Sequence, residues 1–201
     1  MLRVALEELV KEVRITLDEN ASQSAYLKEN RDNLELDEII ISKLPEAARD
    51  VTESCPIESL DPVEMDVSVT STEGGGIITL PDDFLRFVSL RMNGWNRSVT
   101  SLAAEGSDID MMQRNPYTRG TSTKPVCVFT HTESGKKAIE YFGSSSSVDK
   151  ALYMPLPDIE KEGGVDVLPI STLLRKSIVR RAAGLVLLSR GEDELARQFL
   201  G

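Results

Sequence analysis

The only histidine of the chain, His131, lies four residues after one of its two cysteines, Cys127. A Cys–His pair can supply a nucleophile and its general base, provided that the two side chains are within hydrogen-bond reach. In a β-strand, residues four apart point to the same face and are separated by roughly 13 Å. We therefore predict a strand that ends in an ordinary histidine. A single histidine also excludes a metal site built from several histidines.

Two pairs of acidic residues have the chemistry to bind a divalent metal ion, as in a nuclease: Asp82 with Asp83, and Asp108 with Asp110. Each pair also has a simpler role. The first pair follows a proline, where carboxylates stabilise turns. The spacing of Ser107 and Asp110 is that of a capping box at a helix start. We therefore predict no catalytic residue, no metal and no enzymatic activity. The alternative is a small cytoplasmic metal-dependent nuclease or hydrolase with an unrecognised site.

The glycine run Gly74-Gly75-Gly76 could be compared with a phosphate-binding loop. It lacks the lysine and the serine or threonine that follow the glycines in that motif. It separates two short stretches with strand character, so we predict a flexible hairpin tip and no cofactor.

Two segments are better suited to binding than to catalysis. The last long helix is expected to carry a basic stripe opposite its apolar face. Such a stripe can contact acidic neighbours or phosphates, or it can be a solvated helix face. The loop 97–124 is rich in Met, Tyr and Arg, which are enriched in protein interfaces. The predicted interface residues are Met111, Met112, Arg114, Tyr117 and Arg119 in the loop, and Arg175, Lys176, Arg180 and Arg181 in the helix.

Negative charge is concentrated at the start of the chain. Residues 1–66 hold 17 Asp and Glu and 7 Lys and Arg, whereas residues 67–201 hold 16 of each kind. A general nucleic-acid binder has the opposite sign of charge. The plainest interpretation of these acids is a solvated helix face.

The chain shows no sign of export or membrane insertion. Its apolar runs are shorter than the roughly 18 residues that a membrane helix needs, and acids interrupt the apolar pattern at residues 1–8, unlike a signal peptide. The two cysteines have no nearby partners, so neither a disulfide framework nor a zinc ribbon is expected. We predict assembly in a reducing cytoplasm and no contact with a membrane.

Apolar residues at helical spacing predict helices near both ends of the chain. Pro45 is expected to kink or break the second of these helices. The expected helices cover 2–18, 34–53, a short 108–114, and a long one from about residue 169. Alternation of apolar and polar residues predicts strands. The expected strands cover 65–69, 77–80, 86–93, 99–102, 126–130, 138–142 and 151–154.

These elements predict an α+β fold, because a lone amphipathic helix is marginal in water and needs partners. The N- and C-terminal helices are expected to form a helical bundle with a central antiparallel β-rich insertion. Residues 1–64 are the N-terminal helices of the bundle, and residues 65–157 are the insertion with its short helix and docking loops. Residues 158–201 are the C-terminal helices that complete the bundle.

The middle of the chain has a recognisable order of motifs. It runs through Leu80-Pro81 with Phe84, Val88, Gly94-Trp95, Pro125-Val126 and Ile139-Glu140-Tyr141. This order resembles the head–tail adaptor and tail-tube ring proteins of short-tailed bacteriophages, including the ring proteins of crAss-like phages. The resemblance covers residues 77–155 best. It carries over no catalytic residue.

The resemblance implies a structural virion component of the neck or tail, assembled in the host cytoplasm. Copies of such proteins form a ring, commonly twelvefold, that extends the DNA channel below the portal. The implied partners are the other copies of the chain, the portal protein and the next tail or ring protein. Duplex DNA passes nearby without specific binding.

A ring leaves two roles open for the acidic residues Glu7, Glu8, Glu35, Asp37 and Glu38. In the first, they line the channel, where like charge repels the duplex and lets it slide. In the second, they pair with the basic residues of the last helix on a neighbouring subunit.

Overall fold

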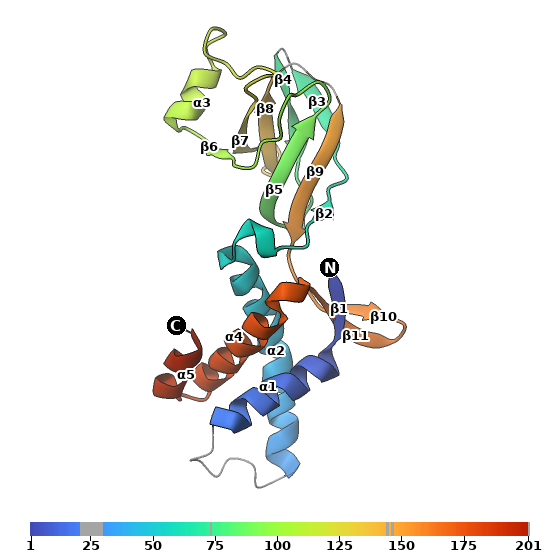
Figure 1. Cartoon of the computed structure of the whole chain (residues 1–201), viewed down its shortest axis with the longest axis vertical. Coiled ribbons are helices and arrows are strands. Elements are labelled where there is room, and N and C mark those ends of the chain that lie inside the picture. The colour runs from blue at the N-terminus through green and yellow to red at the C-terminus, as the bar shows by residue number, and fades with distance from the viewer. Residues whose placement is uncertain (21–29, 73, 144, 146, 201) are drawn as a thin grey trace. The chain divides into compact units, whose positions relative to one another are not determined.

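The computed structural model describes residues 1–20, 30–72, 74–143, 145 and 147–200, and for residues 18–20 and 30–34 it describes the backbone alone. Within these ranges the chain is α+β, with five α-helices and eleven strands in three sheets (Figure 1). Its contacts divide it into two compact units. Unit 1 consists of Met1–Asp61 and Leu156–Gly201, and unit 2 consists of Pro62–Pro155.

Helix α4 (Arg175–Ser189) is the central helix of unit 1. It contacts α1 (Leu6–Asn20), α2 (Asn30–Ser54) and α5 (Asp193–Leu200), as Figure 1 shows. Its buried face contains Ile178, Ala182 and Val186, which recur every four residues and so form one apolar stripe. The helix approaches α5 closely, because a Cβ at Gly184 would lie only 2.6 Å from a methyl carbon of Leu200.

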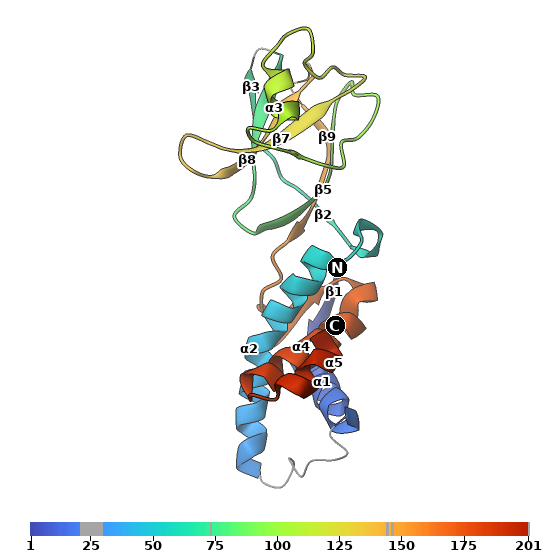
Figure 2. The same cartoon turned by 90° about the vertical axis from the view of Figure 1, so that its left-hand side faces the viewer.

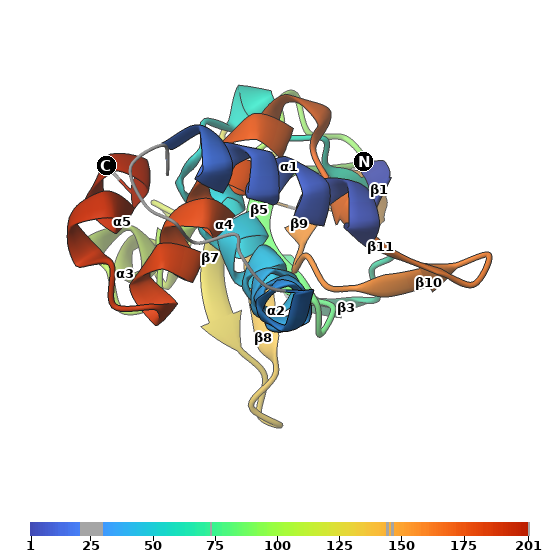
Figure 3. The same ribbon diagram turned by 90° about the horizontal axis from the view of Figure 1, so that it is seen from below.

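Unit 1 also contains an antiparallel sheet of three strands. The first strand, β1 (Leu2–Ala5), pairs with β11 (Val165–Ile170), which in turn pairs with β10 (Glu160–Glu162). Figure 3 shows the β10–β11 hairpin extending beyond the helices of the unit. Strands from both ends of the chain therefore share a unit with the helices.

The predicted helical bundle around one central β-rich insertion is wrong. The terminal segments form a mixed unit of helices and a sheet, and the strands of the middle segment divide between two sheets. The cause lies in residues 2–5, which we assigned to the first helix. Val4 is buried opposite Leu168, so pairing with a distant strand decides the conformation of this segment. Residues 165–170 likewise form a strand where we expected the last helix to begin.

Two prolines show how tertiary contacts override local preference. Pro169 lies within β11, opposite Arg3 of β1. On the other side of β11, the pairing with β10 reaches only as far as Val167. No strand on that side therefore needs a hydrogen bond from the N–H that Pro169 lacks. Pro45 lies inside α2, which continues to Ser54 without the predicted break. Leu44, Ala47 and Ala48 are fully buried on both sides of this proline, and their packing stabilises the helix.

Unit 2 consists of two sheets and one short helix. The smaller sheet has the order β2 (Val63–Glu64), β9 (Val148–Pro155) and β5 (Phe84–Met92). The larger sheet has the order β3 (Val69–Thr72), β4 (Gly75–Thr79), β8 (Lys137–Phe142), β7 (Val126–His131) and β6 (Ala103–Ala104). The β7–β8 hairpin was predicted from its alternation, and it projects beyond the sheet in Figure 2. Of the strand expected at 99–102, only a single bridge between Val99 and Leu90 forms.

The two sheets of unit 2 contribute to one hydrophobic core. Leu90, Met92 and Tyr153 of the smaller sheet belong to the same buried cluster as Ile139 and Tyr141 of the larger one. The helix α3 (Asp108–Gln113) follows β6 and precedes the long connection to β7. The core therefore anchors the sheet whose edge carries α3.

The prediction of a flexible tip at residues 74–76 is wrong for two of its three glycines. Gly75 and Gly76 are buried residues of β4, between β3 and β8. A Cβ on Gly75 would overlap the carbonyl oxygen of Tyr141, and a Cβ on Gly76 would lie 2.8 Å from that of Thr70. These glycines let the neighbouring strands approach closely.

Candidate functional site

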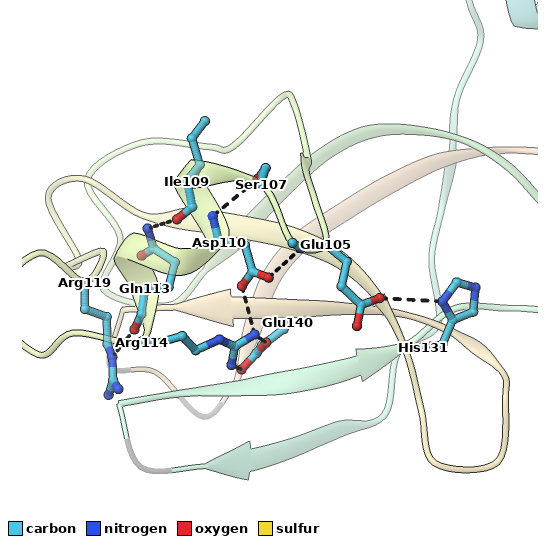
Figure 4. A network of polar contacts seen from close by, with 10 residues as sticks. Glu105, Ser107, Ile109, Asp110, Gln113, Arg114, Arg119, His131 and Glu140 are labelled. Carbon is cyan, nitrogen blue, oxygen red and sulfur yellow. Dashed lines mark hydrogen bonds and ion pairs between the residues drawn. The ribbon is translucent and has the colours of Figure 1, made fainter.

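Helix α3 begins at the predicted cap. The Asp110 backbone N–H donates to the Ser107 hydroxyl oxygen at 3.3 Å, and the carboxylate of Asp110 accepts from the Gly106 N–H at 2.9 Å (Figure 4). The first bond satisfies an N–H group that a helix start leaves unpaired, and the second ties the residue before the cap to the helix. The interpretation of Ser107 and Asp110 as a helix cap is therefore confirmed.

Arg114, at the end of α3, joins this helix to the larger sheet of unit 2. Its two terminal nitrogens donate to the two carboxylate oxygens of Glu140 on β8, at 3.0 and 2.8 Å, and one of them also donates to Asp110 at 2.8 Å (Figure 4). The guanidinium carbon lies 5.7 Å from the ring centre of Phe142. The hydrogen bonds to Glu140, followed by the charges of Glu140 and Asp110, raise the pKa of Arg114 against the opposing effect of burial.

Gln113 and Arg119 hold the loop that follows α3. The Gln113 side chain is buried, donates to the Ile109 carbonyl at 2.8 Å and accepts from the Gly120 N–H at 2.7 Å. Arg119 donates to the Gln113 carbonyl at 3.0 Å (Figure 4). Arg114 and Arg119, which we predicted as interface residues, thus make contacts that fix the loop within its own subunit.

The apolar side chains that this network supports point to solvent. Tyr117 is 97% exposed and Met111 is 61% exposed, and both Met112 and Ile109 are more than half exposed. We call these four residues the α3 surface. All four belong to α3 or to the turn after it, and several large apolar side chains exposed on one short segment are typical of contact sites. Ile109 was not predicted, although its spacing of three residues from Met112 places both on one side of a helix.

The basic residues of α4 differ in their partners. Arg175 donates to Glu12 at 2.6 and 3.3 Å and to Glu8 at 3.0 Å. The hydrogen bonds to Glu12, followed by the one to Glu8, raise the pKa of Arg175. Arg181 donates to Asp50 of α2 at 2.7 and 3.0 Å. Both side chains therefore bind acids of their own chain, on α1 and α2.

Among the described residues, the other two basic residues of α4 form no ion pair with a carboxylate. Arg180 is exposed and donates to the Gln198 carbonyl at 2.7 Å. A carbonyl leaves the charge of a guanidinium uncompensated. Lys176 is exposed, and no carboxylate of the described residues forms an ion pair with its ammonium group. Within the part of the chain that the structure describes, only Arg175 and Arg181 of the predicted basic stripe have carboxylate partners.

Some of the predicted acidic residues of α1 and α2 form ion pairs within the chain, and others are exposed to solvent. Glu8 pairs with Arg175, and Asp37 accepts from Arg14 at 2.7 Å. The side chains of Glu7, Glu35 and Glu38 are exposed. The structure thus separates paired acids from acids that face solvent.

The remaining candidates for chemistry lie apart from one another or have structural partners among the described residues. His131 lies with its Nδ1 3.9 Å from Glu105 (Figure 4), and Asp83 accepts from the Tyr153 hydroxyl at 3.2 Å. Cys127 is buried, and burial raises the pKa of its thiol well above the ordinary value. Across the described ranges, no three His, Cys, Asp or Glu side chains come together as a metal site would require.

Two wider comparisons complete the description. No model of a known protein family and no curated protein matches this chain. Among the residues that the structure describes, no helix has the length and apolar character needed to cross a bilayer.

Proposed function

We propose that this protein is a ring-forming structural subunit of a bacteriophage neck. In this proposal, copies of the chain assemble below the portal, extend the DNA channel and dock the next tail component. The subunit assembles in the host cytoplasm, becomes part of the virion and catalyses no reaction. The proposal starts from the resemblance of residues 77–155 to head–tail adaptor and tail-tube ring proteins.

The observation that supports it best is the α3 surface. Ile109, Met111, Met112 and Tyr117 expose large apolar side chains on a helix of six residues and the turn after it. Tyrosine is enriched among the residues that contribute most to binding, and methionine adapts to irregular partners. A docking surface of this kind is what a neck subunit needs toward the portal or the next ring.

The polar contacts beneath the α3 surface add to this argument. Arg114 ties the helix to Glu140 of the sheet, and Thr118 donates to the Met112 carbonyl at 2.6 Å. The Tyr117 N–H donates to the Asn115 side chain at 3.0 Å. A surface that is already ordered loses less conformational entropy on binding. This arrangement suits a permanent contact between rings.

The test is co-assembly of the protein with its cognate portal and tail proteins. Replacing Met112 and Tyr117 together by serine should weaken docking by at least about 30-fold, as expected for loss of about 2 kcal/mol of contact energy. Because both side chains are exposed, the melting temperature should stay close to that of the wild type.

Leu188→Ser is the matched control, because Leu188 is an exposed apolar residue of α4 outside the α3 surface. It should dock like the wild type. Normal docking by the Met112→Ser, Tyr117→Ser variant would contradict the role of the α3 surface, and a wild type that joins neither portal nor tail would contradict the proposed function itself.

A further inference from the structure

Helix α4 carries two exposed cations, Lys176 and Arg180. Lys176 and Arg180 are four residues apart on α4, so they lie on one side of that helix. Leu173, in the 3-10 turn Thr172–Leu174 just before α4, is 72% exposed. We call Leu173, Lys176 and Arg180 the α4 surface. It combines an apolar contact with two cations that no carboxylate of the described residues neutralises.

The α4 surface is bordered by two hollows. One, of 760 Å³, lies among α1, α4 and α5, with Ile15, Val179 and Phe199 as its apolar lining. The other, of 820 Å³, lies among α2, α4 and α5 and shares Phe199 and Arg180 with the first. The hollows give the α4 surface room to receive side chains on both sides of Arg180.

The carboxylates that line these hollows are already in use. Glu12 accepts from Arg175 and Asp50 accepts from Arg181, both within the chain. Glu53 accepts from Arg49 at 3.0 Å. The net positive character of the α4 surface therefore comes from Lys176 and Arg180, and an acidic partner is the one that complements it.

The chain itself carries exposed acids that complement these cations in charge. Glu35 and Glu38 are exposed on α2 and three residues apart, and Ser42 continues the same side one turn later. We call Glu35, Glu38 and Ser42 the α2 surface. A helix of this kind, with anions on its outer side, can lie across a groove with a cationic ridge and apolar walls.

We propose that the α2 surface of one subunit binds the α4 surface of the next. This contact is the lateral interface of the ring, and it rests on the proposed function. The two surfaces are different parts of one chain, so the contact is head-to-tail, and repeated head-to-tail contacts produce a ring when the rotation closes. Both surfaces belong to unit 1, so in this proposal unit 1 forms the lateral contact and the α3 surface of unit 2 serves docking.

Phosphate groups of DNA are the other anions that Lys176 and Arg180 could bind. The distribution of charge disfavours them, because residues 1–61, which belong to the same unit, hold 15 acids against 7 bases. Tight non-specific binding of a duplex requires many phosphate contacts. Contact with a second copy of the chain requires only ion pairs between the cations of the α4 surface and the carboxylates of the α2 surface.

The test uses two charge-reversed variants of the full chain at low salt, about 0.05 M, where exposed charges act over more than 10 Å. Variant A carries Lys176→Glu and Arg180→Glu, so both of its surfaces are acidic. Variant B carries Glu35→Lys and Glu38→Lys, so both of its surfaces are basic. Sedimentation velocity and negative-stain imaging report the size of the assemblies.

We expect the wild type to form rings, and A and B alone to remain monomers. An equimolar mixture should form rings in which A and B alternate, because each acidic surface then meets a basic one. Recovery in the mixture also shows that both variants are folded. Two pairs of exposed residues outside these surfaces serve as controls. Lys150→Glu with Lys161→Glu and Glu58→Lys with Glu133→Lys change the net charge by the same amounts and should assemble like the wild type.

Three results would overturn the inference. In the first, A and B each form rings alone, which would leave the proposed function intact and refute only this contact. In the second, A and B fail alone and also fail when mixed. In the third, the wild type binds a duplex in a manner that A loses while ring formation by A is unchanged. A wild type that forms no ring, alone or on its portal, would overturn the proposed function as well.

Discussion

Arg114 offers a sharp test of how α3 is held. Replacing it by alanine removes three charge-assisted hydrogen bonds, two to Glu140 and one to Asp110. It also leaves the side chains of Asp110, 9% exposed, and Glu140, 18% exposed, without their cation. A charge-assisted hydrogen bond contributes roughly 1.5–3 kcal/mol. Because the Arg114 side chain is 56% exposed, solvent screens part of this, and we expect a loss of about 2–3 kcal/mol.

Urea unfolding of the whole chain, followed by circular dichroism, measures this loss. Arg114→Lys should lose about half as much, because lysine keeps the charge but not the two-pronged geometry. The control is Arg91→Ala, which breaks an exposed pair with Asp149 at 3.2 Å and should cost under about 1 kcal/mol. A loss in Arg114→Ala no larger than in Arg91→Ala would refute the structural role of Arg114.

Three further changes test other parts of the fold. Leu9→Ala and Ile178→Ala each empty a fully buried position and should lower the free energy of unfolding by about 2–5 kcal/mol; unchanged melting curves would contradict the packing of unit 1. Gly75→Ala should cost on the order of 3 kcal/mol or prevent folding, because its Cβ overlaps the Tyr141 carbonyl, and a normal melting temperature would contradict the described β4. Since burial raises the pKa of Cys127, the folded state keeps a proton that the unfolded chain loses above about pH 8.5. Stability should therefore fall as the pH rises from about 8.5 toward 10, by up to about 1.4 kcal/mol per pH unit. Cys127→Ala should lack this slope, whereas the slope from Tyr141 and Tyr153, whose pKa values burial also raises, begins only near about pH 10 and should remain.

Local signals in the sequence predicted the elements whose contacts are local. The β7–β8 hairpin has alternating strands that pair directly with each other. The start of α3 depends on Ser107 and Asp110, three residues apart. In both cases the interacting groups are neighbours in the chain, so pattern and spacing contain the information.

The elements that were mispredicted depend on partners far away in the chain. β1 is a strand because it pairs with β11, which begins 160 positions after β1 ends. Helical spacing of Leu2 and Leu6 fits the first turn of a helix equally well, and no local signal decides between the two. The same holds for Gly75, whose role depends on the close approach of β8.

For the candidate interface, the sequence likewise shows the type of each residue but not the partner that it contacts in the fold. The sequence identified arginines at 114, 119, 175 and 181 as interface residues from their type alone. The structure gives each of them a contact within the chain, in one case across 167 positions from Arg175 to Glu8. Tyr117 and Lys176, which were also predicted as interface residues, are exposed, and their role in an interface stays a prediction.

Mass measurement of the purified protein with and without its cognate portal tests the proposed ring most directly. Native mass spectrometry, with electron microscopy of the same sample, should show closed rings whose mass is a whole multiple of the subunit mass, and these rings should add to the portal. A protein that stays monomeric under both conditions and hydrolyses nucleic acid when a divalent metal is added would contradict the structural role and favour an enzyme.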